Sequence, residues 1–327
     1  RESWTETHRL MGSQFQFIAQ HEDLYLAGKA VKAAVSEVRR IEHLISSWDA
    51  ESQTSEINRQ AGIKPVKVDW ELFQLILRGK KVSKLTEGAF DLSYASLDKV
   101  WYFHEELTQL PSDSAIRHSV ALIDHQKIWL DEQDTTVFLA QLGMKIGFGA
   151  IGKGYAANRA RAVMMNLGAM HGLVNAGGDL ICWGNDQGQP WRIGIVDPRA
   201  REESMAWLSL SDQAVVTSGD YERFAMIEGE RYSHIIDPRT GWPVKGLVSV
   251  SVVCPDAEVA DALATAVSVL GPERGLALLN HLRGVEGLLV KENGEIVTTD
   301  GFELNWLTQP QAEADLWKTN QLDHEKE

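Results

Sequence analysis

The hydrophobic pattern of the chain changes from helical spacing to strand spacing and back again. Residues 14–20 have the pattern of a strand, and apolar side chains spaced three or four residues apart then predict an amphipathic helix over 26–46. A polar stretch over 46–62 interrupts this pattern, and a second helix is predicted over 69–85. The N-terminal part is therefore expected to be mainly helical.

The next part is less regular. Residues 86–110 carry glycine and aromatic residues without a clear period, and a short helix is predicted over 112–119. Residues 127–130 and 136–139 flank the polar pair Asp131-Glu132, which predicts two paired strands. We therefore expect an irregular connection here, closed by one hairpin.

Strand spacing dominates the middle of the chain. A helix over 155–167 ends at Gly168, the residue type that commonly adopts the left-handed conformation behind a helix. Six apolar runs then follow, separated by turn residues such as Gly177-Gly178 and Asp197-Pro198. The six predicted strands are 171–175, 180–183, 191–196, 205–210, 214–217 and 247–254.

Helical spacing returns near the C-terminus. A helix over 258–270 stops at Gly271, and Pro272 suits the first turn of another helix that ends near Leu282. The last regular feature is a hairpin over 285–298. Its two strands are joined at Asn293-Gly294.

The order of these elements predicts the fold class. Helices, then mostly antiparallel strands, then helices again favour an α+β fold in which antiparallel sheets pack with helices. No Gly-x-Gly-x-x-Gly follows the first strand, so a Rossmann dinucleotide fold is excluded. We predict a single domain over 1–302 and a polar, acidic C-terminal tail over 303–327.

Charge limits the partners. The 327 residues include 32 Lys plus Arg and 46 Asp plus Glu, a net charge of -14, and no basic stripe is present. Nucleic acid is excluded as a partner, because it requires clustered cations. An acidic protein that binds an anionic cofactor needs a cation to offset the repulsion, which points to a metal. No run of 18 apolar residues occurs, so no transmembrane segment is predicted.

The two cysteines, Cys182 and Cys254, each lie in an apolar, strand-like run. This placement favours buried free thiols, with one disulfide as the alternative, since spacing does not determine pairing. Two cysteines with this spacing do not make a zinc site.

A carboxylate and a hydroxyl lie one helical turn apart in Asp261-Ala-Leu-Ala-Thr265. Such a pair points to one side of a helix and supplies two oxygen ligands to a hard cation such as Mg²⁺. In the alternative, Thr265 bonds back to the carbonyl of Asp261 while Asp261 faces water. The pentad alone favours this alternative.

A glycine-rich turn, Gly147 to Gly154, leads into the predicted helix over 155–167. Small residues allow the backbone to approach a ligand, the helix N-terminus favours a phosphate, and Lys153 adds charge. An ordinary glycine-rich turn is the alternative. The turn is not a Walker A loop, because Gly154 stands where that motif has Ser or Thr.

A histidine beside a polar turn is the third feature. His234 precedes Asp237-Pro-Arg-Thr-Gly241, and a histidine there can act as a general base near neutral pH, although a lone histidine more often makes a structural hydrogen bond. Asn175-Ala-Gly-Gly-Asp179 is either a tight bend or a close approach to a ligand.

Taken in order, these segments resemble the FAD:protein FMN transferases, the ApbE family. The resemblance runs from about Met11 to Thr298, and the His234 and Asp261 blocks are its most specific parts. The segments that carry it are Ile45-Ser-Ser-Trp48, Ser55-Glu-Ile-Asn58, Gly88-Ala-Phe-Asp91, Gly149-Ala-Ile-Gly-Lys-Gly-Tyr155, Asn175-Ala-Gly-Gly-Asp179, Thr217-Ser-Gly-Asp-Tyr221, His234-Ile-Ile-Asp-Pro-Arg-Thr-Gly241 and Ala260-Asp-Ala-Leu-Ala-Thr265.

The resemblance implies a T-fold-like architecture and a set of site residues. It implies His234 as the base that takes the proton of the acceptor hydroxyl. It implies Mg²⁺ bridging the FAD pyrophosphate, held by Asp261, Thr265 and the carbonyls of Ala150 and Ala264. The implied FAD contacts are Met11, Trp48, Ala89, Phe90, Asp91, Lys153 and Ile235.

The activity implied is transfer of FMN from FAD to a Ser or Thr of an acceptor flavoprotein, with release of AMP. The alternatives are a Mg²⁺-dependent FAD pyrophosphatase, which uses water in place of the acceptor, and a non-catalytic FAD-binding protein. Family members are commonly exported, often as lipoproteins. The resemblance therefore implies a periplasmic protein or a membrane-anchored lipoprotein, and a chain that begins at Arg1 without an apolar leader fits a mature or trimmed product.

The chain departs from the family pattern at two places. The family usually has Asp, which contacts FAD, where Gly147 stands. Its Asp-Pro-Thr-Val-Gly-Pro-Leu run is here Asp91-Leu-Ser-Tyr-Ala-Ser-Leu97. The metal positions and the His234 block are intact, so these departures put only part of the FAD contacts in doubt.

Overall fold

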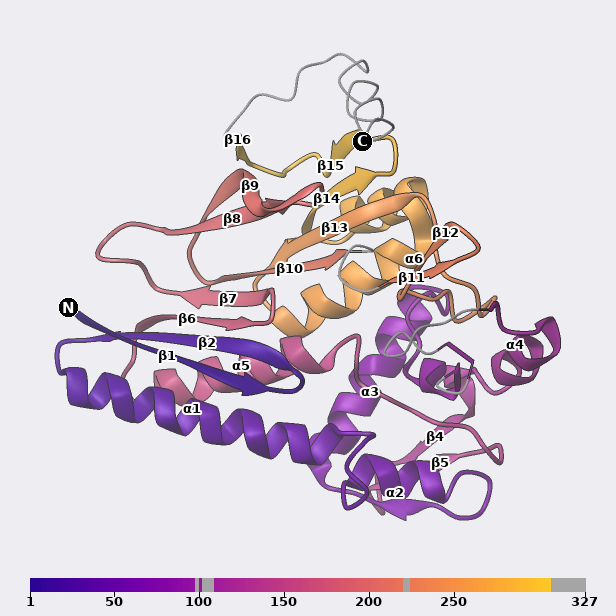
Figure 1. Cartoon of the computed structure of the whole chain (residues 1–327). Helices are drawn as coiled ribbons and strands as arrows, with labels where there is room; N and C mark the ends of the chain where they lie inside the picture. The colour runs from indigo at the N-terminus through magenta and orange to yellow at the C-terminus, as the bar shows by residue number, and fades with distance from the viewer. Residues whose placement is uncertain (98–99, 102–108, 220–223, 307–327) are drawn as a thin grey trace.

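An eight-stranded antiparallel sheet forms the centre of the fold (Figure 1). The computed structural model describes residues 1–97, 100–101, 109–219 and 224–306. Each neighbouring pair of strands in the sheet is antiparallel. In spatial order the strands are β1 (Glu2–Leu10), β2 (Ser13–His21), β6 (His171–Ala176), β7 (Asp179–Trp183), β10 (Gln213–Gly219), β13 (Leu247–Cys254), β14 (Glu286–Lys291) and β15 (Ile296–Thr298).

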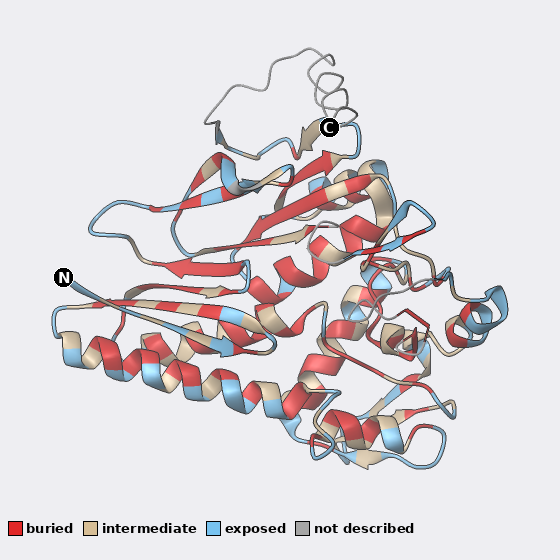
Figure 2. Ribbon diagram, in the orientation of Figure 1, coloured by how far each residue is buried: buried red, intermediate tan, exposed pale blue. Residues whose placement is uncertain are grey.

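Three helices cover one face of this sheet: α1 (Leu24–Ile45), α5 (Gly152–Asn166) and α6 (Ala257–His281). Side chains alternate between the two faces of a strand, so Ile181 and Trp183 of β7 pack toward the helices. Most of the core lies on the helical face of the sheet, and its buried residues are coloured red in Figure 2.

A hairpin covers the other face. It consists of β8 (Trp191–Asp197) and β9 (Ala200–Leu210), and the short strand β16 (Asn305–Trp306) pairs with β9. Leu180 and Cys182 of β7 point into this second core, which explains why the middle strands are apolar on both faces. The remainder of the predicted tail, 307–327, lies outside the described residues.

The smaller elements gather at one end of the sheet (Figure 1). A three-stranded sheet, β3-β5-β4, and a separate hairpin, β11-β12, join them. Their bounds are α2 (Gln53–Arg59), β3 (Val66–Lys67), α3 (Trp70–Leu85), the 3₁₀ helix η1 (Leu92–Leu97), α4 (Asp113–Val120), the 3₁₀ helix η2 (His125–Lys127), β4 (Ile128–Asp131), β5 (Thr136–Leu139), β11 (Phe224–Ile227) and β12 (Glu230–Ser233).

Helix α6 connects this end to the large sheet. Gly271, with φ 80°, breaks its helical backbone immediately before Pro272, as the sequence predicts. Buried Glu258 in its first turn pairs with Arg78 of α3 through two contacts of 2.7 and 3.0 Å. In the described part of the chain, α6 is the one helix long and apolar enough to cross a membrane, and half of its most apolar window is buried inside this fold. We interpret it as a core helix.

The fold class and the predicted helices and strands are confirmed, with bounds that differ by at most five residues. The strand β1 and the helix α2 are among the elements that were not predicted. β1 is an edge strand whose residues are mostly exposed or half-buried, so it lacks apolar alternation. α2 is short and polar, and it begins where the Ser52 hydroxyl accepts a hydrogen bond from the Ser55 amide. Cys182 and Cys254 are buried free thiols, as favoured.

Gly154 allows α5 to approach α6 closely, and this contact yields a prediction. A Cβ at Gly154 would overlap the Ala257 carbonyl oxygen and lie 2.9 Å from the Cβ of Asp261. Because a backbone carbonyl cannot rotate away, we expect Gly154→Ala to lower the free energy of unfolding by about 2 kcal/mol, measured by urea denaturation.

Gly28→Ala is the matched control. Gly28 also lies inside a helix, but a Cβ there would meet only the Trp4 side chain, at 3.1 Å. A side chain can shift, and alanine favours a helix by about 1 kcal/mol over glycine, so the control should stay near the stability of the parent. Equal effects of the two substitutions would contradict the packing argument.

Candidate active site

The glycine-rich turn and the Asp261 helix meet where α5 crosses α6. The Gly154 amide donates a hydrogen bond of 3.0 Å to Asp261 Oδ2, and Asp261 is only 4% exposed. Thr265 lies one turn further along α6 and is half-buried. Asp261 is buried and does not face water, so the part of the alternative that places its carboxylate in solvent is wrong.

Side chains from two other elements hold the start of the glycine turn. The Asn58 amide group of α2 bonds both the N–H and the C=O of Ile146, at 2.8 and 3.0 Å. The Ser96 hydroxyl accepts a hydrogen bond from the Lys145 amide, at 3.0 Å, and the Gly147 amide donates to the Leu92 carbonyl, at 2.9 Å. The turn is therefore held from both sides by α2 and η1.

The glycines of this turn face occupied space. A Cβ at Gly149 would overlap the Tyr94 hydroxyl, and one at Gly152 would lie 2.8 Å from Ile45 Cδ1 and 3.6 Å from Met11 Cε. Met11, a predicted FAD contact, thus reaches the turn from the β1–β2 connection. Its amide donates to Glu42 Oε1, at 3.0 Å, and its φ is 50°.

Lys153, also a predicted FAD contact, lies in an ion pair with Asp179. The Lys153 ammonium is 2.8 Å from Asp179 Oδ2, a charge contact rather than a well-directed hydrogen bond. Asp179 begins β7 and is 2% exposed, after a turn closed by Asn175 Oδ1 and the Gly178 amide at 2.8 Å. Burial raises the pKa of Asp179, and the charge of Lys153 offsets part of this shift.

The Gly88 and His234 blocks meet further along α6. Ala89, Ile235 and Val269 form one buried cluster, so α6 links these predicted FAD contacts to Asp261. His234 follows directly after β12 and is half-buried. Asp237 closes the predicted turn: its carboxylate bonds the Arg239 amide, at 2.9 Å. Asp220 and Tyr221 of the same family pattern lie outside the described residues.

Asp91 does not point outward. It is 5% exposed, and its carboxylate accepts hydrogen bonds from the Ser93 amide and hydroxyl, at 2.8 and 2.6 Å. It also accepts one from the His125 amide, at 2.9 Å, and lies 3.1 Å from His125 Nδ1. Asp91 therefore anchors η1, and its contact with FAD stays a prediction.

The remaining predicted positions differ in exposure. Phe90 is 2% exposed and packs in the main core, whereas Trp48 is 84% exposed, just beyond the end of α1. An exposed indole can stack on a flat ring, which suits the predicted role of Trp48. Phe90 can reach a ligand only through its backbone.

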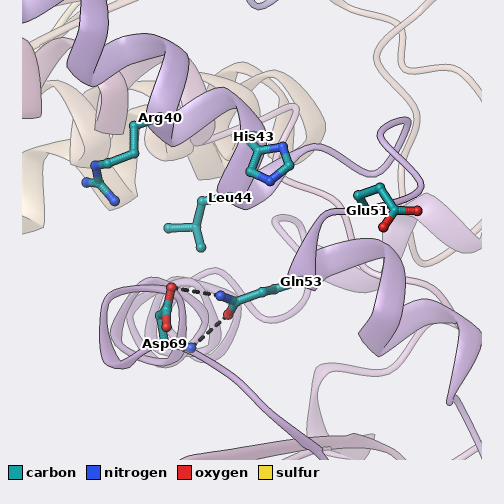
Figure 3. Close-up of a pocket in the computed structure, with 6 residues that line it drawn as sticks. All are labelled: Arg40, His43, Leu44, Glu51, Gln53 and Asp69. Carbon is teal, nitrogen blue, oxygen red and sulfur yellow. Dashed lines mark hydrogen bonds between the residues drawn. The ribbon is translucent and has the colours of Figure 1, made fainter.

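Two surface hollows lie away from Asp261. The one in Figure 3 has a volume of about 300 Å³ and holds the Gln53–Asp69 hydrogen bonds. The other, about 410 Å³, is lined by Ser233 and Val244 on either side of the His234 block, together with charged residues. Neither hollow is lined by a predicted FAD or metal residue.

A metal at this site would need main-chain ligands. Among the described residues no three His, Cys, Asp or Glu side chains cluster as a metal site. Asp261 offers a carboxylate, Thr265 a hydroxyl one turn further along α6, and Ala150 a carbonyl in the glycine turn, and oxygen atoms of these kinds suit Mg²⁺. The Ala264 carbonyl already accepts the Ser268 hydroxyl, at 2.9 Å.

Comparison with known proteins agrees with this geometry. The model of the ApbE family matches residues 11–289. The chain belongs to the ApbE family. An FAD:protein FMN transferase of Klebsiella pneumoniae is 35% identical over 91% of this chain and 92% of its own, and one of Treponema pallidum is 35% identical over 83% and 81%. The crystal structure of the ApbE protein of Thermotoga maritima is 31% identical, covers 91% of this chain and 97% of its own, and has a TM-score of 0.85.

Two residues that contact the glycine turn escaped the sequence analysis. Asn58 was recognised only as part of a family segment, and its bonds to Ile146 show what it does. Tyr94 was noted only as a departure from the family run, yet its hydroxyl accepts a hydrogen bond from the Gly149 amide, at 3.2 Å. Burial raises the pKa of Tyr94, and the charge of Asp261 raises it further. Only tertiary structure reveals both contacts.

The raised pKa of Asp179 predicts how stability depends on pH. A carboxyl with a raised folded-state pKa contributes fully to stability below its unfolded pKa, about 3.9, and this contribution is lost as pH rises through the folded-state pKa. Asparagine does not titrate. We therefore expect Asp179→Asn to gain stability relative to the parent as pH rises from about 4.5 to 7, measured by urea denaturation.

Asp134→Asn is the control, because it makes the same replacement of a carboxylate by an amide at an exposed position. If Asp179→Asn instead loses stability relative to the parent over the same pH range, the charge of Lys153 lowers the pKa of Asp179 by more than burial raises it.

Proposed function

We propose that this ApbE-family enzyme transfers FMN from FAD to a Ser or Thr hydroxyl of an acceptor protein, with Mg²⁺ and with release of AMP. The observation that carries the proposal is the hydrogen bond between the Gly154 amide and buried Asp261, which joins an anion-binding turn to a carboxylate suited to a cation. Relatives at 35% identity are named FAD:protein FMN transferases.

The chemistry requires alignment and charge neutralisation. The acceptor oxygen forms a bond to the phosphorus on the riboflavin side, and the bond between that phosphorus and the AMP oxygen breaks. When bound, Mg²⁺ would neutralise charge on the pyrophosphate oxygens. Asp261 and Thr265 would hold it, with the Ala150 carbonyl and, as a further proposed ligand, the Ala264 carbonyl.

The chain's own residues have separate tasks. His234 would take the proton from the acceptor hydroxyl, which typically increases the rate ~10²–10⁴-fold. Lys153, held by Asp179, would contribute positive charge to the anionic substrate. Trp48, on the surface, would stack on a ring of FAD. Export and lipid anchoring stay predictions of the family resemblance.

A labelling experiment tests the proposal. The protein is incubated with FAD, Mg²⁺ and a domain that bears the acceptor motif Asp-Gly-x-[Ser/Thr]-Gly-Ala-[Ser/Thr], with and without EDTA. We expect the acceptor to gain the mass of one FMN phosphoester and AMP to appear in equal amount, both only without EDTA. Mass spectrometry and chromatography measure the two products.

Two variants locate the metal dependence. Asp261→Asn removes the carboxylate charge, so labelling should fall to the level seen with EDTA, whereas Glu273→Gln, an exposed position on the same helix, should label normally. AMP without labelled acceptor would identify a pyrophosphatase. Bound FAD without either product would identify a binding protein.

His234→Ala separates catalysis from binding. Because a general base acts on the acceptor and not on FAD, labelling should slow by about 10²-fold or more while FAD affinity stays within about twofold. Rates come from single-turnover labelling and affinity from flavin fluorescence. A variant that loses FAD affinity while keeping its labelling rate at saturating FAD would make His234 a binding residue.

A further inference from the structure

The hydroxyl of Tyr94 lies inside the proposed active site. η1 carries this side chain to the glycine turn, where the hydroxyl accepts the Gly149 amide proton, at 3.2 Å. A Cβ at Gly149 would overlap the hydroxyl. The hydroxyl therefore lies directly against the glycine turn.

Gly147, where the family usually has Asp, lies next to this side chain. A Cβ at Gly147 would lie 3.1 Å from Ala95 Cβ and 3.7 Å from the Tyr94 hydroxyl. Gly147 and the Tyr94 hydroxyl are therefore neighbours beside the glycine turn, at ordinary contact distance.

The base of η1 is rigidly held. The Asp91 carboxylate bonds Ser93 and His125, and the Ser96 hydroxyl bonds both the N–H and the C=O of Lys145, at 3.0 and 3.3 Å. Anchors on both sides of Tyr94 fix its backbone. The hydroxyl thus comes to the turn in a defined position, as a binding residue requires.

The hydroxyl has a proton left to donate. A phenol accepts and donates hydrogen bonds, and Tyr94 uses its oxygen as the acceptor for Gly149. Among the described residues, none accepts the Tyr94 proton. A phosphate oxygen is a strong acceptor, and the N-terminus of α5 beside this turn favours an anion.

We propose that Tyr94 is a substrate-binding residue of this active site, whose hydroxyl accepts a hydrogen bond from the Gly149 amide and donates a hydrogen bond to a pyrophosphate oxygen of FAD. This inference rests on the proposed function. It gives the departure of residues 91–97 from the family run a purpose, because Tyr94 supplies a donor where Gly147 supplies no side chain.

Tyr94→Phe tests the inference, with Tyr25→Phe, an exposed tyrosine on α1, as the matched control. Phenylalanine keeps the ring and removes both hydrogen bonds. We expect the variant to bind FAD and ADP, which share the pyrophosphate, about tenfold more weakly than the parent, since hydrogen bonds to charged groups contribute this much. Its thermal midpoint without ligand should stay within about 2 °C of the parent, which a purely structural role would not predict.

Each other outcome overturns the inference. Unchanged FAD affinity would show that the hydroxyl only supports the turn. Tighter binding would show that it competes with phosphate for the Gly149 amide, and weaker FAD binding with unchanged ADP binding would place the contact on the flavin. If the parent protein neither labels the acceptor nor binds FAD, the proposed function itself fails. If the parent protein binds FAD and labels the acceptor, a result obtained with Tyr94→Phe tests the role of Tyr94 and leaves the proposed function in place.

Discussion

The close approach of α5 to α6 at Gly154 is the constraint on which the site depends. Without a side chain at 154, the α5 backbone reaches the Ala257 carbonyl and its amide reaches Asp261 Oδ2. A single hydrogen bond thereby connects a turn able to bind an anion with a carboxylate able to bind a cation. Both helices pack on the same face of the large sheet, so their packing against its strands keeps them in contact.

Buried charge accompanies this arrangement. Asp179 and Glu258 are both nearly inaccessible, and burial raises the pKa of each, while Lys153 and Arg78 offset part of the shift. Such pairs are poor contributors to stability, because each ion loses its hydration. Their value lies in position: Asp179 holds Lys153 beside the turn, and Glu258 ties α3 to the helix that bears Asp261.

The sequence predicted the elements that depend on a local signal. It did not predict contacts between residues that are far apart in the sequence. The helix 26–46 and the stop at Gly271 follow from periodicity and from one residue type, and both are present. β1 is polar at an edge, so its pairing with β2 has no apolar signature. The pentad of Asp261 favoured a solvent-facing carboxylate, because sequence does not show which face of a helix another helix will cover.

The same reasoning explains Gly147 and Tyr94. Read separately, a glycine at 147 is a missing side chain and a tyrosine at 94 is an irregular substitution in a loop. In three dimensions the Tyr94 hydroxyl lies 3.7 Å from the place of a Cβ at 147, and it accepts a hydrogen bond from the Gly149 amide. Two positions far apart in the sequence are therefore neighbours in the structure. Whether a departure from the family pattern weakens a site depends on which side chains lie beside it, and here the neighbouring side chain carries a hydroxyl that can donate a hydrogen bond.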